Sequence, residues 1–413
     1  MKVAIVGAGP AGLMAAICAA KKGASVTLYE KQDIVGKKLL ITGKGRCNIT
    51  NDCSVEELVA AFAPNEKFLY SAFNSFDSKD AISFMNQLGV MTKVERGRRV
   101  FPVSDDATEV RDALLRHAKE NGVKVKKSAP VTKLDVADGV IVGVFTKDGK
   151  ESYDRVIITT GGASYPLTGS TGDGYALAKE VSHSIIEPLP ALVPLETVEE
   201  WPKEIMGLSL KKVTLSLYEN DKYIASEFGE MLFTHFGVSG PLVLTLSRYI
   251  CTAQRKKKDI SRFSLRLDLK PALSEETLDA RVQRDLIEAS KKQVKNSLSK
   301  LLPQSIIPCV IELSKVNPES AANQMIKADR ERLVHTIKNL HMTIKSTRPL
   351  KEAIVTSGGI KLSEVNPKTM ESKIVKGLYF AGEVLDIDAV TGGYNIQAAL
   401  SCGFIAGNAC IES

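Results

Sequence analysis

MKVAIVGAGPAG occupies residues 1–12, and the acidic Glu30 follows eighteen positions after the last glycine of this stretch. Residues 3–6 are a short apolar run, which is typical of a buried parallel strand. Gly7, Gly9 and Gly12 follow with G-x-G-x-x-G spacing. In this pattern the first glycine allows a tight turn, the second lets the backbone approach a pyrophosphate, and the third lets the next helix pack closely on the strand. The opening therefore predicts a strand–turn–helix unit that binds a dinucleotide.

The residues after the glycines complete the same unit. A helix is expected from about residue 10 to residue 22, and its first N–H groups and positive dipole end would point at the phosphates. Residues 24–29 read as the next strand, and Glu30 at its end is placed to accept hydrogen bonds from a ribose. The pattern does not distinguish NAD from FAD.

The composition is that of an ordinary globular protein. The chain has 413 residues, of which 44% are hydrophobic and 25% charged, so we expect two or three domains. No apolar run reaches the roughly eighteen residues that span a bilayer. Lys2 leads directly into the first strand without a signal-peptide pattern. We therefore expect a cytoplasmic protein with no membrane partner.

Cysteine spacing and charge exclude several classes. The seven cysteines are scattered and include no C-x-x-C pair, which argues against a disulfide scaffold, a metal site or a dithiol redox pair. The net charge of +7 is too small to imply nucleic acid. The densest basic run, Arg255 to Lys258, is interpreted as a solvated hairpin loop, because a nucleic-acid site would need a wider basic face with aromatic groups.

Hydrophobic periodicity divides the chain into an α/β part and two inserted parts. We expect a discontinuous, doubly wound Rossmann-like domain over residues 1–192 and 347–413, a β-rich domain over residues 193–270 and 341–346, and a helical domain over residues 271–340. Three prolines between residues 188 and 194 mark the crossing into the insert. Helices are predicted at residues 55–63, 78–88, 107–121, 274–302, 318–340 and 395–410. Strands are predicted at residues 123–127, 131–136, 140–147, 154–160, 211–218, 222–227, 231–234, 263–269, 341–345 and 377–381.

Five segments each place glycines beside polar residues at the end of a predicted strand, where doubly wound folds bind ligands. They are GAGPAG (7–12), GKGRCNITN (43–51), TTGGASYPLTGSTGDGY (159–175), FTHFGVSGP (233–241) and AGEVLDIDAVTGGYNIQAA (381–399). Together they resemble the bacterial aminoacetone-oxidase-like FAD flavoproteins, a family that also includes a bile-acid dehydro-reductase. The resemblance covers essentially the whole chain, and it extends more distantly to the flavin domain of the succinate dehydrogenase and fumarate reductase group.

The resemblance implies an FAD-binding domain interrupted by a β-barrel-like domain and a helical domain. Glu383 takes the place of the acid that binds the ribityl chain, and Val131 that of a backbone contact to adenine. The helix after Gly393 would face the flavin N1–C2=O edge and stabilise the negative charge of reduced flavin. The implied cofactor contacts are Gly7, Gly9, Pro10, Ala11, Gly12, Glu30, Lys31, Lys38, Arg46, Cys47, Asn48, Val131, Thr160, Gly161, Gly162, Gly382, Glu383, Gly392, Gly393, Tyr394, Asn395 and Ile396.

Several of these residues also have a plainer interpretation. Arg46 fits a surface ion pair, Cys47 a packed thiol with no redox role, and Glu383 an acid at a helix N-terminus. Three further acids fit solvated-loop or turn positions: Asp173, Asp386 and Asp388.

Candidate catalytic residues are fewer. His235 follows a predicted strand within a family motif and titrates near neutral pH, so it could act as a base or a substrate contact. Tyr165 and Tyr394 could line the substrate side of the flavin. The remaining histidines are interpreted as structural: His117, His183, His335 and His341.

The resemblance implies hydride transfer from a small substrate to flavin N5, with an amino-ketone such as aminoacetone as the substrate and O2 as the acceptor. Two alternatives stay open. One is a reductase of a C=C bond with NAD(P)H as a transient electron donor. The lack of a second strand–G-x-G-x-x-G–helix unit counts against this alternative. The other is a flavin-binding sensor or RNA-associated protein without turnover, supported only by the basic run and the net charge.

Overall fold

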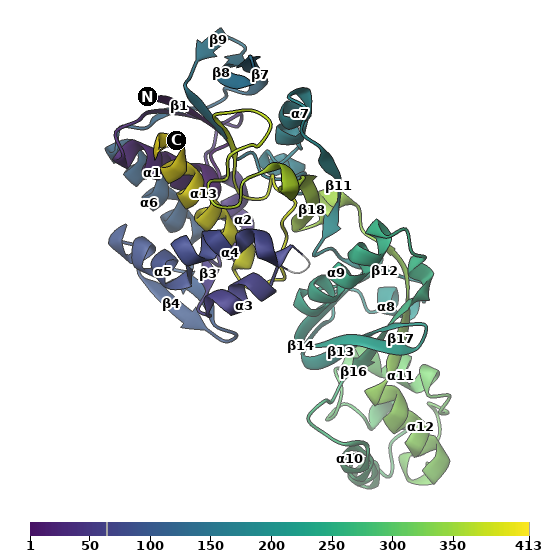
Figure 1. The fold of residues 1–413 in the computed structure, drawn as a ribbon. Helices are drawn as coiled ribbons and strands as arrows, with labels where there is room; N and C mark the ends of the chain where they lie inside the picture. The colour runs from purple at the N-terminus through teal and green to yellow at the C-terminus, as the bar shows by residue number, and fades with distance from the viewer. Residues whose placement is uncertain (63–64, 413) are drawn as a thin grey trace. The chain divides into compact units, whose positions relative to one another are not determined.

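The computed structural model describes residues 1–62 and 65–412, which form two compact units. Unit 1 comprises Met1–Ala191 and Leu350–Ser413, and unit 2 comprises Leu192–Pro349. In Figure 1 unit 1 holds the purple beginning and the yellow end of the chain, and unit 2 is drawn in teal and green. The boundary at Ala191 lies within the proline-rich stretch that was expected to mark the crossing.

Unit 1 is built on a five-stranded parallel sheet with the order β19-β10-β1-β2-β6. The strands are β1 (Lys2–Val6), β2 (Ser25–Tyr29), β6 (Lys124–Lys126), β10 (Arg155–Ile158) and β19 (Leu378–Phe380). Because the strands are parallel, the glycine loop after β1, Glu30 after β2, Thr159 after β10 and Ala381 after β19 share one edge. The predicted α/β fold class is confirmed.

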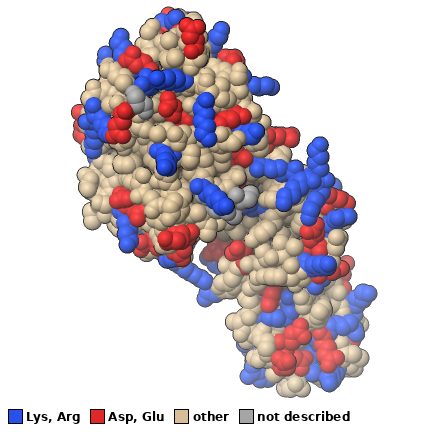
Figure 2. Space-filling model, viewed as in Figure 1, with Lys and Arg blue, Asp and Glu red and all other residues tan. Residues whose placement is uncertain are grey.

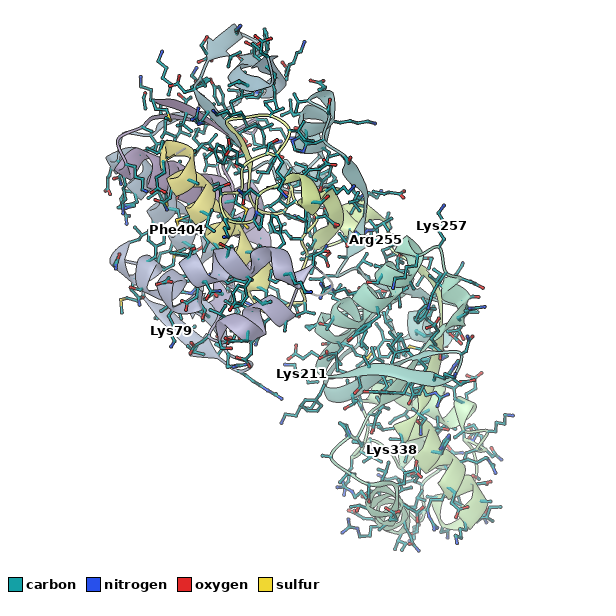
Figure 3. All side chains as sticks on the ribbon, viewed as in Figure 1. Lys79, Lys211, Arg255, Lys257, Lys338 and Phe404 are labelled. Atoms are coloured by element: carbon teal, nitrogen blue, oxygen red, sulfur yellow. The ribbon has the colours of Figure 1, made fainter. Side chains whose placement is uncertain are left out.

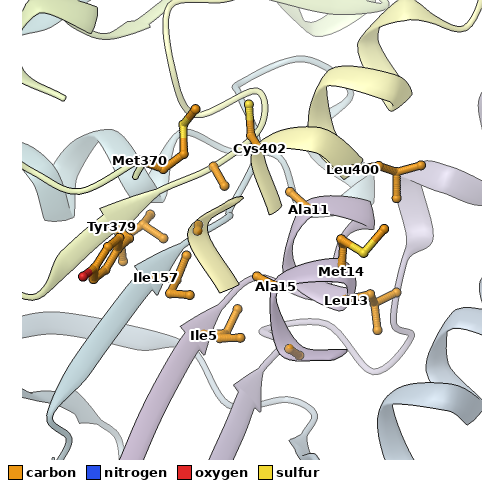
Figure 4. Packing of buried hydrophobic residues seen from close by; sticks show 14 of the residues in the cluster. Ile5, Ala11, Leu13, Met14, Ala15, Ile157, Met370, Tyr379, Leu400 and Cys402 are labelled. Atoms are coloured by element: carbon orange, nitrogen blue, oxygen red, sulfur yellow. The ribbon is translucent and has the colours of Figure 1, made fainter. Parts of the chain in front are cut away.

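Two helices from opposite ends of the chain cover this sheet together. They are α1 (Pro10–Lys21) and α13 (Tyr394–Glu412). A Cβ atom on Gly403 would lie 2.3 Å from the carbonyl oxygen of Ala11, and one on Gly407 would lie 2.4 Å from that of Ala15. The helix backbones can approach this closely only because both positions are glycine. Figure 4 shows the small side chains of α1 in this packed layer.

The other elements of unit 1 surround this core. The helices are α2 (Lys37–Ile41), α3 (Val55–Ala60), α4 (Glu66–Ser75), α5 (Ser78–Gln87), α6 (Ala107–Glu120) and α7 (Asp173–Glu180). Three small antiparallel sheets have the orders β3-β5-β4, β7-β8-β9 and β11-β18. Their strands are β3 (Thr50–Asn51), β4 (Thr92–Glu95), β5 (Arg99–Pro102), β7 (Val131–Ala137), β8 (Val140–Thr146), β9 (Gly149–Ser152), β11 (Ile185–Ala191) and β18 (Val355–Ile360).

Unit 2 is a closed six-stranded barrel with helices packed on it. The strand order is β12-β15-β14-β13-β16-β17. The strands are β12 (Leu195–Thr197), β13 (Ser209–Glu219), β14 (Lys222–Thr234), β15 (Gly237–Ser239), β16 (Phe263–Asp268) and β17 (Leu340–Thr347). The helices are α8 (Trp201–Glu204), α9 (Pro241–Arg255), α10 (Glu275–Glu288), α11 (Ile307–Leu313) and α12 (Lys327–Lys338). One hydrophobic cluster runs through barrel and helices, and the predicted division into separate β-rich and helical domains stays a prediction.

Short 3-10 helices connect these elements at Thr42–Gly45, Pro166–Thr168, Ile260–Arg262, Val294–Asn296, Gln304–Ile306, Ala322–Gln324, Leu350–Glu352 and Leu362–Glu364.

Two predicted helices are shorter than expected. The helix predicted over 274–302 begins after Ser274, whose side chain accepts a hydrogen bond from the Thr277 N–H, but it ends at Glu288. The helix predicted over 318–340 begins only at Lys327. The reason is shared: the Val294 N–H donates to the Ser320 carbonyl and the Ala322 N–H to the Lys292 carbonyl, so the two stretches pair with each other. The end of the helix predicted over 55–63 lies outside the described residues.

The barrel region departs from the prediction at several places, and its strands β12 and β15 had not been predicted. Residues 222–227 and 231–234 belong to the single strand β14, which pairs along its length with β13. The stretch 241–255, where no helix was expected, forms α9. The basic run begins at Arg255, the last residue of this helix, and continues into the turn after it rather than forming a hairpin loop. Figure 3 labels Arg255 and Lys257 there. Hydrophobic residues at helical spacing, including Leu242, Leu246 and Ile250, bury the inner face of α9 and explain the difference.

Candidate functional site

The three glycines of the first loop have different surroundings. Gly7 has a φ of 106°, and a Cβ there would lie 2.6 Å from the Thr159 carbonyl oxygen. A Cβ on Gly12 would lie 1.9 Å from the Gly7 carbonyl oxygen. Around Gly9 no described atom comes within 4 Å of such a Cβ, so the space above this residue is open. Gly9 is also the N-cap of α1 and provides no side-chain cap, which leaves the helix N-terminus accessible to a phosphate.

Glu30 closes the loop from the end of β2. Its carboxylate accepts hydrogen bonds from the Ala8 N–H at 3.1 Å and the Gln32 N–H at 2.8 Å. Burial raises the pKa of this carboxyl, although both hydrogen bonds lower it. Next to it, Lys31 forms an ion pair with Asp173, the first residue of α7. Asp173 is therefore an ion-paired helix residue and not a simple turn residue.

Lys38 and Glu383 form an ion pair close to the end of β19, at the sheet edge that also carries the glycine loop. The Lys38 Nζ lies 2.6 Å from Glu383 Oε2 and 2.8 Å from Ser164 Oγ. Glu383 Oε1 accepts a hydrogen bond from the Thr356 N–H at 2.9 Å. The Thr356 hydroxyl accepts from the N–H of Ala163 at 2.8 Å and from that of Ser164 at 3.0 Å.

This network joins four separate segments of the chain, which contain Lys38, Ser164, Thr356 and Glu383. Glu383 lies in a turn, so its interpretation as a helix N-terminal acid is wrong. Thr356 and Ser164 were not predicted as site residues: Ser164 stands within a quoted segment, but nothing in the sequence around Thr356 singles it out. Asp386 and Asp388 are also buried, at 8% and 7% exposed, so they are not solvated loop acids.

The segment that contains Asn48 meets the glycine turn before α13. Asn51 Nδ2 donates to the carbonyl oxygen of Gly392 at 3.1 Å. A Cβ on Gly393 would lie 2.4 Å from the carbonyl oxygen of Thr50, so only glycine fits there. Tyr394, the first residue of α13, is half-buried. Asn395 folds back on its own loop, where its Oδ1 accepts from the Ala389 N–H at 2.9 Å.

Buried polar atoms without partners gather around these segments. Of the thirteen such side-chain atoms in the described part of the chain, six are oxygens of Asn48, Thr50, Asn51, Thr160, Tyr175 and Gln397. Buried polar groups are nearly always hydrogen-bonded, and leaving one unpaired is costly. All six lie in the segments 43–51, 159–175 and 381–399. A ligand rich in hydrogen-bonding groups, such as FAD, would satisfy them, so the residues present fit the cofactor that the resemblance implies.

Arg46 and Cys47 occupy different environments. The Arg46 guanidinium pairs with Glu95 at 2.9 Å and Asp105 at 3.2 Å and stacks over the Phe101 ring at 4.0 Å. In the structure, the partners of Arg46 are therefore those expected from the ion-pair interpretation. Cys47 is fully buried with a φ of 60°, and burial raises the pKa of its thiol to about 12. A thiol in this state is not a nucleophile at neutral pH.

The remaining predicted residues divide between the units. Tyr165 and Tyr394 belong to unit 1, and burial raises the pKa of both phenols. His235 belongs to unit 2, where it is exposed between β14 and β15 and lies edge-on to Phe236 at 4.9 Å. Val131, the predicted adenine contact, is the buried first residue of β7.

No helix within residues 1–62 and 65–412 combines the length and hydrophobicity needed to cross a bilayer.

Comparison with known proteins identifies the family. The chain matches the model described as HI0933-like protein Rossmann domain over residues 1–409. It is 31% identical over 415 residues to the 3-dehydro-bile acid delta(4,6)-reductase of Clostridium scindens, covering 100% of this chain and 99% of that protein. It is 30% identical over 406 residues to a ribosomal RNA dihydrouridine synthase of Haemophilus influenzae, covering 97% of this chain and 96% of that protein.

A solved structure supports the fold. The 3-ketosteroid-delta4-(5alpha)-dehydrogenase of Rhodococcus jostii RHA1 matches with a TM-score of 0.55 at 15% identity, covering 100% of this chain and 96% of that one. The sequence resemblance to an FAD flavoprotein family is therefore confirmed. The chain belongs to the HI0933-like Rossmann family and is an FAD-dependent oxidoreductase.

Proposed function

We propose that this oxidoreductase is an NAD(P)H-dependent reductase that adds two hydrogen atoms across a ring C=C bond conjugated to a carbonyl group. The names of two full-length relatives support this reaction class: a delta(4,6)-reductase and a dihydrouridine synthase each saturate a ring double bond. Reduction was an alternative to oxidation at the level of sequence, and it now becomes the favoured direction.

The chain would hold FAD along the shared edge of the parallel sheet. The loop from Gly7 to Gly12 and Glu30 would bind the ADP half, and Lys38 and Glu383 the ribityl chain. Residues 48–51 and 392–397 would surround the flavin, because their unpaired polar atoms and close backbone approach suit a planar polar ring. When bound, FAD supplies two-electron hydride chemistry through that ring.

The observation that carries the proposal is the position of Tyr394 at the start of α13, directly after the glycine turn that contacts Thr50 and Asn51. Saturating a C=C bond requires a proton on the carbon beside the one that accepts hydride, so the site needs a proton donor. Burial raises the pKa of the Tyr394 phenol above its ordinary value of 10.0, and the hydroxyl therefore keeps its proton at neutral pH. Tyr165 shares this property.

The raised pKa values of these phenols give amino-ketone oxidation with O2 less support. An amine must lose its ammonium proton before hydride can leave, which requires a base or a desolvated pocket. Phenols with raised pKa values do not serve as bases near neutral pH, and the Cys47 thiol is equally protonated.

Charge distribution favours a nucleic-acid substrate over a small one. Unit 2 holds 25 of the 55 Lys and Arg residues but only 19 of the 48 Asp and Glu residues, so it carries +6 of the net charge of +7. Figure 2 shows Lys and Arg side chains gathered where α9 ends, next to the positions of Arg255 and Lys257 in Figure 3. A basic surface of this kind attracts a polyanion, which supports uridine in ribosomal RNA as the substrate. The small total charge had argued against such a partner. That total, however, hides the unequal division of charge between the two units.

Sequential anaerobic mixing tests the proposal. The FAD-loaded protein is first mixed with NADPH, and the flavin absorbance is followed. The reduced protein is then mixed with a uridine-containing ribosomal RNA fragment, a dehydro-bile acid, or O2. We expect bleaching by NADPH and rapid return of the absorbance with the RNA or the bile acid. Bleaching by aminoacetone but not by NADPH would show instead that the protein is an oxidase.

A further inference from the structure

Three arginines form the tip of a short hairpin in unit 1. Strands β4 and β5 pair up to Glu95 and Arg99, and Arg96, Gly97 and Arg98 make the turn between them. Gly97 and Arg98 have φ values of 75° and 57°. We call residues 96–99 the arginine tip. It contains no acidic residue, and Arg96 and Arg98 are exposed while Arg99 is half-buried.

The backbone of the arginine tip is fixed by separate hydrogen bonds. The Asp52 N–H donates to the Arg98 carbonyl at 2.8 Å. Asn51 Nδ2 donates to the Gly97 carbonyl at 3.0 Å. The Arg98 guanidinium binds both carboxylate oxygens of Glu57, at 2.8 and 2.7 Å. These contacts hold an exposed turn in one conformation, which reduces the entropy lost when its side chains bind a ligand.

The same contacts place the arginine tip beside the flavin segment. Asn51 Nδ2 donates to the Gly392 carbonyl as well as to the Gly97 carbonyl, so one amide joins the tip to the turn before α13. Arg98 also lies close enough to Tyr394 for its positive charge to act against the burial that raises the pKa of the phenol. The hairpin therefore presents cations next to the residue that we assign as proton donor.

We propose that the arginine tip is a phosphate-binding site that holds an anionic part of a reactant beside the flavin. This inference rests on the proposed function and extends it to the recognition of substrate. Guanidinium groups match phosphate oxygens with paired N–H donors and keep their charge at every physiological pH. Glu57 pairs with Arg98, and the exposed Asp52 stands nearby, so the attraction of the tip for a phosphate is moderated by acidic neighbours.

Two reactants carry such a phosphate: the RNA backbone around a target uridine, and NADPH. Binding to the oxidised FAD-loaded protein distinguishes them without any turnover. The probes are a short single-stranded RNA that contains uridine, NADPH, and the nucleoside uridine, which has no phosphate. Binding is followed by fluorescence anisotropy of labelled RNA and by perturbation of the flavin spectrum.

The variant Arg96→Gln/Arg98→Gln removes two charges, and Lys79→Gln, at an exposed position of α5, is the matched control. We expect the double variant to weaken binding of RNA, NADPH or both by roughly tenfold or more, because each lost contact is a charged hydrogen bond. If RNA is the ligand, the dependence of log K on log salt should fall by about 0.7 for each lost contact. Uridine binding should stay the same, as should every value for Lys79→Gln.

A second variant acts in the opposite direction. Glu57→Gln releases Arg98 from its carboxylate partner, so phosphate-bearing probes should bind more tightly. It also remains informative if the double variant fails to fold. The proposal is overturned if RNA and NADPH binding are unchanged in the double variant, if uridine binding falls by the same factor, or if Glu57→Gln weakens binding. Because all readouts are equilibrium binding constants, they test the arginine tip even if the reduction reaction itself is not observed.

Discussion

Replacing Gly9 or Gly12 with alanine should separate cofactor binding from folding. At Gly12 the new methyl group would lie 1.9 Å from the Gly7 carbonyl oxygen, which is backbone and cannot rotate away. Overpacking of this kind costs about 3 kcal/mol or more. At about 2–4 °C per kcal/mol for a large domain, Gly12→Ala should lower the Tm of the FAD-free protein by roughly 6–12 °C.

Gly9→Ala should leave the FAD-free protein almost unchanged. Its φ of −80° suits alanine, and no described atom lies within 4 Å of the new Cβ. Losing glycine at the N-cap costs about 0.5–1 kcal/mol, which the reduced entropy of the unfolded chain offsets by about 0.4–1 kcal/mol. The open space is where we place the pyrophosphate, so the FAD Kd should rise at least about tenfold, equivalent to about 1.4 kcal/mol.

Calorimetry of both FAD-free variants and fluorescence titration with FAD measure these two effects. The reasoning is refuted if Gly9→Ala binds FAD as tightly as the unmodified protein. It is also refuted if Gly9→Ala lowers the Tm as much as Gly12→Ala does.

Three further predictions concern single side chains of unit 1. Glu383→Gln should weaken FAD binding about 10- to 100-fold, because it removes a charged hydrogen-bond acceptor, and slower FAD release on dilution would contradict this. Cys47 should resist iodoacetamide at pH 7 in the folded protein and react only after unfolding, because burial raises the pKa of its thiol to about 12; rapid labelling of the folded protein would be the contrary result. Burial lowers the pKa of His183 below its ordinary value of 6.5, so the unfolded state binds the proton more readily, and the free energy of unfolding should fall as pH drops below about 6.5. His183→Gln should reduce this pH dependence of Tm, and an unchanged dependence would exclude His183 as its source.

The opening unit could be predicted from sequence because its determinants are local. Glycine spacing, a buried strand and an acid at the end of the next strand are all read within thirty residues, and each has one geometric reason. The α/β class and the FAD family follow from this unit together with the later glycine segments. The barrel was anticipated in its alternating strands, whereas α9 was missed because its apolar spacing stands within that alternating region.

The contacts that complete the site could not be predicted in this way. Thr356 reaches Glu383 and the segment around Ser164 through hydrogen bonds that span up to 193 residues. Asn51 joins Gly97 to Gly392 with a single amide group. No local pattern encodes such pairs, since they depend on which loops the sheet brings to the same edge. The phosphate-binding role that we propose for the arginine tip likewise depends on where its hairpin lies in the fold.

Product analysis tests the central claim, reduction of a conjugated C=C bond, most directly. The FAD-loaded protein is incubated with NADPH and either unmodified ribosomal RNA or an unsaturated dehydro-bile acid, and the products are examined by mass spectrometry. We predict that one of the two substrates gains two hydrogen atoms, and that Tyr394→Phe slows this gain while NADPH still reduces the flavin. The account is contradicted if neither substrate gains hydrogen while aminoacetone and O2 yield hydrogen peroxide.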